Sequence, residues 1–501
     1  DATGKHISPG VWDCHSHTAI SGGVNEGANR VTIECRIQDV INHRDVNIYR
    51  QLAGGTVGAL QLHGSANPIG GQSATSKWRW GKRPREFLVQ GAPEGVKFAL
   101  GENPCREDQP TGGRGQQTEA QQIVNLANER PRTRMGVEAN YREAFDEAKN
   151  YMDEWDAYRA GRIKVEPRRN LRLEGIVELL KKQRWVHSHG YRQDEMLSLI
   201  RICQQYGVRL QTLQHVLEGF KIADEMAAAK VGGSTFADWW GYKLEAYDAI
   251  PHNLALMFER GVSVSVNSDS NEHARRLTHE AAKAIRYGGV SPEVALSFCT
   301  IEPVRQLGID RITGSLVPGK DADLVVWSGD PLSIYTKAEQ TYVDGIKLYD
   351  IHDDIKQRYE REQYIELARE KFAEPEVLPT QEVFELGAVP AMPLVTGVAG
   401  NAKYPRKPLH IVGATVHPMT GDPFVGDVLV GSDGLITATG RVSAPRDAIR
   451  IDGRGKHVYP GMIESYSQIG LVEIPRIPVS VDSSERGDFN PDLRPERSIN
   501  P

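Results

Sequence analysis

The segment RWVHSHGYRQDEMLSLIRICQQYGVRLQTLQHV, residues 184–216, carries the pattern that decides the fold. Two short apolar runs, 184–189 and 208–216, flank a stretch whose apolar residues have helical spacing, as in a strand–helix–strand unit. The alternation extends from residue 52 to 310, with further apolar runs at 54–62, 95–100 and 262–270. Because strands that alternate with helices form parallel sheets, we expect an α/β fold.

Polar residues end several of these runs. His187, His215 and Asp269 each follow an apolar stretch, and the C-terminal strand ends of a parallel barrel meet at one mouth. The segment PGVWDCHSH, residues 9–17, adds His15 and His17, which share one face of a strand. Each histidine alone is more often a core or surface imidazole. Together, the five residues predict a divalent metal site, because imidazole and carboxylate groups are typical zinc ligands.

Size and composition favour a multidomain enzyme that acts on a small molecule. The 501 residues exceed what one core usually organises. A net charge of -6 without a basic block argues against nucleic acid. The five cysteines have no CxxC spacing, so neither a disulfide framework nor a thiolate zinc site is indicated. No apolar run approaches the roughly 20 residues of a membrane span.

The sequence pattern changes after the predicted barrel region. Residues 312–329 and 409–459 have short strands with Gly- and Pro-containing turns, and 352–373 form a highly charged helix. An internal repeat links the two ends, because six residues recur at a constant offset of 451: Asp1, Gly4, Lys5, His6, Pro9 and Gly10 match Asp452, Gly455, Lys456, His457, Pro460 and Gly461. We therefore expect a tandem protein with a partial second copy. In that copy Tyr466 and Gln468 replace the HxH histidines.

Over about residues 1–350 the sequence resembles the amidohydrolase superfamily, in the branch of imidazolonepropionases and metal-dependent dipeptidases. The motifs that carry the resemblance are PGVWDCHSH, GGTVGALQLHGSANPIGG, GVKFALGENP, VHSHGYRQDE, LQHVLEG, NSDS and GSLVPGKDADLVVW. The resemblance implies a (β/α)8 TIM-type barrel with a small β-sandwich and one or two divalent ions, with zinc favoured. The expected segments are the end of a sandwich (1–8), the barrel (9–308), sandwich strands (309–350), a helix and linker (351–408), sandwich strands of the second copy (409–459) and the start of its barrel-like module (460–501).

The resemblance also suggests roles for individual residues. Lys97 resembles the lysine that CO2 converts to a metal-bridging carbamate, with Lys77 as a competing candidate and an ordinary salt-bridged lysine as the alternative. Asp269 is expected to be both a metal ligand and the catalytic proton shuttle, and His189 a catalytic or oxyanion contact or a structural residue. The candidate substrate contacts are Tyr191, Arg192, Glu102, Asn103 and His63.

The predicted function is metal-dependent hydrolysis of an amide, peptide-like or cyclic amide C–N bond by activated water. Two alternatives remain: a metal-dependent deaminase, and a non-catalytic scaffold or binding module with a structural metal. The expected partner is a small-molecule substrate, with a second copy of the chain or the remainder of a longer tandem chain as further partners. The resemblance favours a periplasmic or exported protein over a cytoplasmic one.

Overall fold

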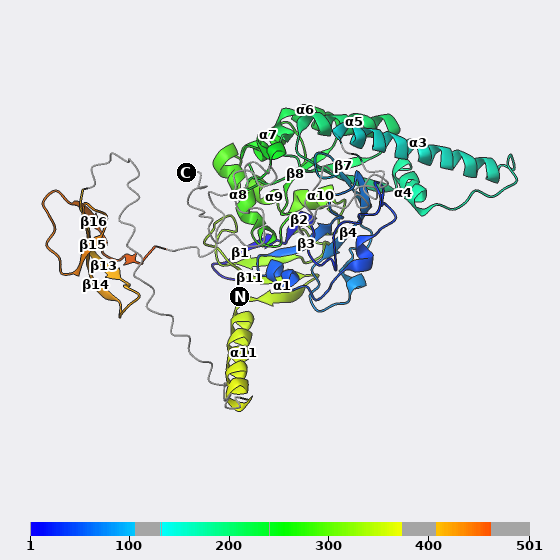
Figure 1. Ribbon diagram of the computed structural model, residues 1–501. Coiled ribbons are helices and arrows are strands. Elements are labelled where there is room, and N and C mark those ends of the chain that lie inside the picture. Colours follow the sequence, from blue (N-terminus) through cyan, green and yellow to red (C-terminus); the bar gives the residue numbers. More distant parts are fainter. Residues whose placement is uncertain (1, 106–130, 132, 240, 373–406, 462–501) are drawn as a thin grey trace, which may run out of the picture. The chain divides into compact units, whose positions relative to one another are not determined.

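The computed structural model describes residues 2–105, 131, 133–239, 241–372 and 407–461 (Figure 1). These residues form two compact units, of which the first ends at Arg369 and the second begins at Glu370. Within the described ranges, no helix is long and apolar enough to cross a membrane.

The first unit is built on an eight-stranded barrel sheet whose neighbouring strands follow chain order. Its strands are β2 (Val11–Ser16), β3 (Thr56–Gln61), β4 (Ile69–Lys77), β5 (Glu94–Ala99), β6 (Arg184–Gly190), β7 (Leu210–His215), β8 (Gly232–Thr235) and β9 (Val264–Val266). Across the closure between β9 and β2, the backbone N–H of Asp269 donates to the carbonyl of His15 at 3.1 Å. The predicted TIM-type α/β architecture is confirmed.

One strand departs from a fully parallel barrel. β4 pairs antiparallel with both β3 and β5, because residues 62–68 return the chain without a crossover helix. The segment 69–77, IGGQSATSK, lacks the apolar run of the other strands, so its pattern does not predict a strand. The short β8, GGST, was missed for the same reason.

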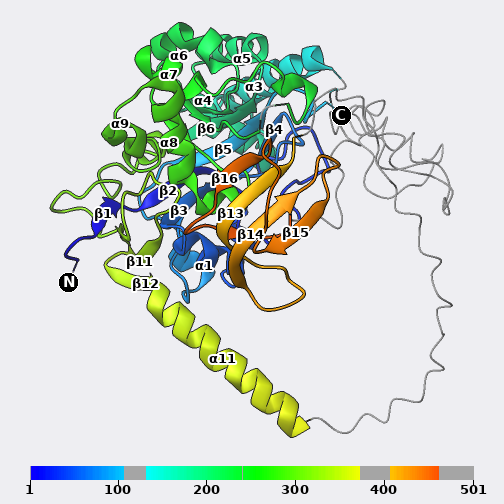
Figure 2. The same cartoon turned by 90° about the vertical axis from the view of Figure 1, so that its left-hand side faces the viewer.

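Helices cover the outside of the strands (Figures 1 and 2). They are α1 (Val46–Leu52), α3 (Arg134–Arg159), α4 (Leu171–Leu180), α5 (Gln193–Tyr206), α6 (Ala223–Ala229), α7 (Asn253–Glu259), α8 (Leu277–Gly288), α9 (Pro292–Ser297) and α10 (Ile301–Gln306). A further helix, α11 (Ile351–Phe372), is not part of this layer. The main core lies between the two layers and includes Val186 and Leu213 of the strands and Leu199 of α5. Gly207, at φ +70°, ends α5 and returns the chain to β7. The sequence predicts two helices across 118–163, separated at Pro131. The one beyond Pro131 corresponds to α3, while 118–130 lie outside the described residues.

A small antiparallel sheet packs beside the barrel, with the order β1 (His6–Pro9), β10 (Leu324–Trp327), β11 (Ala338–Val343) and β12 (Ile346–Asp350). Close contact with the barrel requires glycine at residue 55, since a Cβ there would lie 2.7 Å from the Trp327 ring. β1 runs through Gly10 directly into β2. The small sheet therefore fixes the start of the strand that carries His15.

The second unit contains its own sheet of β13 (Leu409–Val416), β14 (Phe424–Val430), β15 (Ile436–Gly440), β16 (Ile449–Asp452) and β17 (His457–Val458). Because an unpaired sheet edge is unfavourable, the sequence favours either a pairing of 409–459 with 312–329 or the cover of that edge by another chain. The first of these expectations is wrong, because β10 pairs with β1 and β11, whereas β13 pairs with β14, β16 and β17.

The repeated residues share a local conformation. Gly4 and Gly455 have φ values of +76° and +73°. The backbone N–H of Lys5 donates to the carbonyl of Ala2 at 3.0 Å, and that of Lys456 donates to Gly453 at 2.9 Å. A strand follows each turn. The matching sequence positions therefore have matching turns.

Candidate metal centre

The two histidines of the HxH motif lie at the C-terminal end of β2. His15 is buried, and its Nε2 is 3.4 Å from Nε2 of His17. Nδ1 of His17 lies 2.8 Å from the carbonyl oxygen of Leu62. Because a carbonyl only accepts hydrogen bonds, Nδ1 carries the proton in neutral His17 and Nε2 keeps a lone pair. That lone pair points toward the cluster formed with His15.

Asp269 faces both histidines from the loop after β9. Its Oδ1 is 3.3 Å from His17 Nε2 and 3.5 Å from His15 Nε2, and its Oδ2 is 3.8 Å from His215 Nε2. Burial raises the pKa of Asp269, but the neighbouring imidazoles and Lys97 outweigh burial and lower the pKa to about 2. The carboxylate is therefore ionised at neutral pH.

His215 reaches the same place from the end of β7. Its φ is +70° and that of Asp269 is +46°, a left-handed conformation that is uncommon outside glycine. Strained backbone of this kind is often found at functional sites. Ligand atoms of His15, His215 and Asp269 lie within 4.8 Å of one another. Burial lowers the pKa of His215 to about 3 and that of His15 well below its ordinary value, so both imidazoles stay neutral.

Lys97 enters the cluster from β5. Its side chain is fully buried, and Nζ is 3.2 Å from Nε2 of His15. Burial lowers the pKa of this amine to about 7, with the Asp269 carboxylate opposing the shift. A partly neutral lysine amine is a nucleophile, which is the form that reacts with CO2.

Lys77, the competing candidate, lies elsewhere and is fully paired. Its Nζ is 2.6 Å from Asp321, 2.8 Å from Asp323 and 2.6 Å from Asp344. Burial lowers its pKa, but the three carboxylates outweigh burial and raise it overall. This cluster ties β4 to the small sheet. Lys77 is therefore a structural lysine.

The structure separates the two histidines of β6, both of which are buried. Nδ1 of His187 forms a hydrogen bond of 2.6 Å with the Thr212 hydroxyl. The His187 ring lies against Gly95, and a Cβ at residue 95 would be 3.1 Å from Cδ2 of that ring. The ring centroid of His189, in contrast, is 4.7 Å from that of His215. The structure thus brings His189 beside the cluster and places the ring of His187 beside Gly95, two residues before Lys97. Strand periodicity alone could not choose between them, because positions i and i+2 share a face.

The predicted substrate contacts occupy different settings. Tyr191 is buried and its ring stacks on that of His215, with centroids 5.3 Å apart. Arg192 forms a bidentate pair with Asp194, at 3.1 Å for each contact, at the start of α5. His63 hydrogen-bonds through both ring nitrogens to backbone groups, at 2.8 Å to the Gly64 carbonyl and 2.8 Å from the Glu26 N–H. His63 is thus held as part of the loop after β3.

Glu102 and Asn103 follow β5 and meet a lysine that the sequence did not single out. The ammonium of buried Lys243 is 3.1 Å from Asn103 Oδ1 and 3.6 Å from Glu102 Oε1. It also lies 4.2 Å from the centroid of the Tyr191 ring and pairs with Glu245. Lys243 was missed because it follows the short β8, which has no apolar pattern.

Two other groups of metal-ligand type occur in the described residues, and in each of them a lysine pairs with the carboxylates. Asp238, His273 and Glu280 form one group, in which Lys283 pairs with both carboxylates. Asp321, Asp323 and Asp344 form the other, around Lys77. The group around Asp269 has the more typical zinc chemistry, since imidazoles dominate it.

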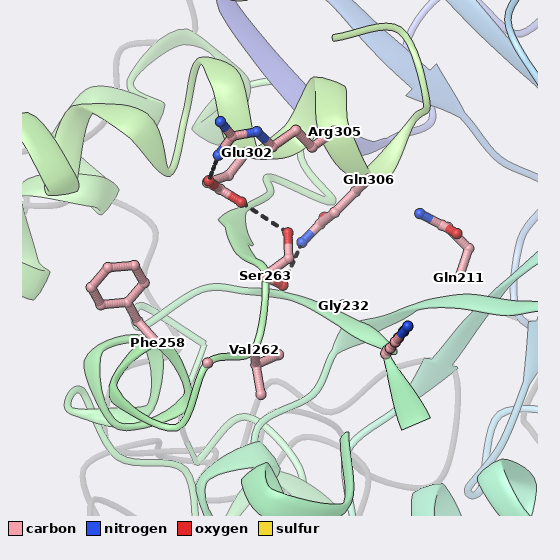
Figure 3. A pocket seen from close by; sticks show the side chains of 10 residues that line it. Gln211, Gly232, Phe258, Val262, Ser263, Glu302, Arg305 and Gln306 are labelled. Atoms are coloured by element: carbon pink, nitrogen blue, oxygen red, sulfur yellow. Dashed lines mark hydrogen bonds and ion pairs between the residues drawn. The ribbon is translucent and has the colours of Figure 1, made fainter. Parts of the chain in front are cut away.

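A cavity of about 420 Å³ lies at the opposite end of the strands (Figure 3). Its lining includes Gln211, Gly232 and Ser263, at the starts of β7, β8 and β9. Ser263 donates to Glu302 at 2.9 Å, and Gln306 donates to the Ser263 carbonyl at 2.9 Å (Figure 3). These contacts join α10 to the N-terminal ends of the strands, away from His215 and Asp269.

Known proteins are similar to this chain in fold and in sequence. A crystal structure of an amidohydrolase from Thermotoga maritima MSB8 is 32% identical to the chain, with a TM-score of 0.62, over 70% of this chain and 88% of that one. The chain belongs to the amidohydrolase family. The profile of that family matches residues 248–347.

Two curated amidohydrolase-type relatives support this membership. The amidohydrolase tasK of Hapsidospora irregularis is 27% identical over 381 residues, which is 70% of this chain and 37% of tasK. The imidazolonepropionase of Picrophilus torridus is 30% identical over 106 residues, 21% of this chain and 26% of that protein. The chain thus spans less than half the length of these two relatives.

Proposed function

We propose that this amidohydrolase hydrolyses a C–N bond of an amide, peptide-like or cyclic amide substrate with one or two divalent ions, zinc being favoured. The proposed ligands are His15, His17, Lys97 as its carbamate, His189, His215 and Asp269. His189 takes the place predicted for His187. The observation that carries the proposal is the meeting of the buried, neutral imidazoles of His15 and His215 and the half-buried ring of His17 with the ionised Asp269 carboxylate.

A divalent ion held by these residues would supply Lewis-acid chemistry, which would lower the pKa of water at the site toward about 7. Asp269 accepts a proton from the attacking water, since its carboxylate is ionised, and returns the proton to the leaving nitrogen. Tyr191 packs beside His215. We infer that its aromatic ring forms one wall of the substrate site, with Glu102, Asn103 and Arg192 as outer candidates.

Carbamylation of Lys97 is the second part of the proposal. The lone pair of the neutral amine forms a C–N bond with CO2, one C=O π pair moves onto oxygen, and the proton lost from the nitrogen passes to water. The product is an anionic oxygen ligand, which removes the repulsion between an ammonium and a divalent cation. The buried amine with a pKa of about 7 supports this step.

We also propose that residues 409–501 belong to a second, partial copy. The six repeated residues and the matching turns at Gly4 and Gly455 support it. Its Tyr466 and Gln468, which lie outside the described residues, are poor zinc ligands. We therefore expect no HxH metal site in the second copy.

The test is a hydrolysis screen of zinc-loaded wild type and Asp269→Asn on N-acyl amino acids, dipeptides and cyclic amides. We expect turnover of at least one class by wild type and a loss of about 100-fold or more in the variant. Asp39→Asn, a substitution of an exposed carboxylate, serves as the control. Equal turnover by Asp269→Asn would refute the role of Asp269. Ammonia release from a purine or pyrimidine would favour the deaminase, and metal binding without any hydrolysis would favour the scaffold.

A further inference from the structure

The carboxylate of Asp13 accepts hydrogen bonds from both ends of the barrel closure. Asp13 is completely buried on β2, two residues before His15. Its Oδ1 accepts from the backbone N–H of His15 at 3.1 Å and from that of Ser268 at 3.0 Å. Its Oδ2 accepts from the Ser268 hydroxyl at 2.5 Å. One side chain therefore joins β2 to the loop that carries Asp269.

The neighbours of Ser268 extend this connection. The Ser268 hydroxyl accepts from the backbone N–H of Ser270 at 3.2 Å, while the N–H of Asp269 donates to the His15 carbonyl at 3.1 Å. The backbone N–H groups of residues 268, 269 and 270 are thus all bonded to residues of β2 or to the Ser268 hydroxyl. Together these contacts hold Asp269 at φ +46°.

That conformation determines where the Asp269 carboxylate lies. β9 ends at Val266, so Asp269 is three residues beyond the regular strand. A free loop would relax toward negative φ, since left-handed backbone is unfavourable for aspartate. The carboxylate would then leave its place 3.3 Å from His17 and 3.5 Å from His15.

We propose that Asp13 and Ser268 form a positioning pair that holds the Asp269 carboxylate against the HxH histidines. The pair acts through the backbone of Asp269 and is itself outside the ligand set. The inference rests on the proposed function and names the residues that build its site.

The experiment compares wild type with Asp13→Asn, Ser268→Ala and the double variant. The first measurement is the dissociation constant for Zn²⁺ by competition with a chelator. Each single variant should bind about 10- to 100-fold more weakly, as for other groups that orient metal ligands. The double variant should bind no more weakly than the weaker single variant, because the two residues act as one unit. The second measurement is the visible spectrum of the Co²⁺-loaded protein, which should change in every variant because the carboxylate moves.

A matched control separates positioning from general destabilisation. Thr341→Val removes another buried hydrogen bond, from the Thr341 hydroxyl to the Leu52 carbonyl at 2.7 Å in the small sheet. It should lower the urea midpoint of the metal-free protein but leave the Zn²⁺ affinity and Co²⁺ spectrum unchanged. If Asp13→Asn does not fold, Ser268→Ala carries the test, since it removes only one hydroxyl.

Two results would contradict the inference. If wild type binds zinc and both single variants bind it with the same affinity and Co²⁺ spectrum, the positioning role is wrong while the proposed function stands. If wild type binds no zinc, both fail.

Discussion

Nδ1 of His17 donates a hydrogen bond to the carbonyl oxygen of Leu62 at 2.8 Å, and this contact determines which nitrogen faces Asp269. The neutral ring keeps its lone pair on Nε2, 3.3 Å from the carboxylate. The loop after β3 therefore orients a ligand that comes from β2. A histidine that served only packing would have no need of this orientation.

Two substitutions of His17 separate ligation from orientation. In His17→Gln the side-chain oxygen can approach the place of Nε2, but the hydrogen bond to Leu62 is lost. In His17→Asn the side-chain amide can form the hydrogen bond to Leu62, but it is too short to bind the metal ion. We expect zinc affinity to fall in both, by about 10- to 100-fold for Gln and further for Asn. Chelator competition measures both values. A larger loss for Gln than for Asn would contradict the proposed ligation through Nε2.

His189 and His187 should respond differently to substitution by asparagine. His189→Asn should lower zinc affinity at least tenfold, because the ring beside His215 is lost. His187→Asn should retain zinc and lower the free energy of unfolding by about 1–3 kcal/mol, because a buried ring and its Thr212 contact are lost. Elemental analysis and urea denaturation of the same samples give both values. Loss of zinc from His187→Asn and its retention by His189→Asn would identify His187 as the metal ligand.

The two buried lysines provide a similar contrast. Lys77→Met leaves Asp321, Asp323 and Asp344 without their cation, and we expect the free energy of unfolding to fall by about 3 kcal/mol with zinc binding unchanged. Lys97→Met should instead weaken zinc binding, and should not destabilise the metal-free protein, since it removes a buried amine. Loss of zinc from the Lys77 variant at full stability would contradict this division.

His63 predicts a pH dependence of stability. Burial lowers its pKa from 6.5 to about 4. As the pH falls below 6.5, the unfolded chain takes up a proton at His63 before the folded protein does. The contribution of His63 to the free energy of unfolding is therefore complete above pH 6.5 and is lost as the pH falls toward 4. The full loss is about 3 kcal/mol. His63→Gln should show a shallower fall in unfolding free energy between pH 6.5 and 4 than wild type. Identical slopes would contradict the assigned environment.

Much of the fold followed from runs of apolar residues that end in polar ones. The strands with Lys97, His189 and His215 were predicted because each is apolar before its functional residue. β4 and β8 were not predicted, because IGGQSATSK and GGST have no apolar run and form strands by pairing with their neighbours. Local sequence contains no record of such pairing.

The site was predicted less completely, because the role of a residue depends on its position along the strand and on the side chains that contact it. His187 and His189 share a strand face, and the difference between them comes from Thr212 and Gly95 on other strands. Arg192 stays a candidate substrate contact, and its pairing with Asp194 two residues away is a feature that the spacing of strands and helices does not predict. Asp13 stood inside the quoted HxH motif, yet its partner Ser268 is 255 residues away. Such long-range contacts need the three-dimensional structure.

The most direct test of the central claim is anomalous X-ray diffraction at the zinc edge from crystals grown with Zn²⁺. The account predicts a peak within coordination distance of His15 Nε2, His17 Nε2 and an oxygen of Asp269. Peaks confined to other groups, such as Asp238, His273 and Glu280, with none beside His15 and His17, would contradict it.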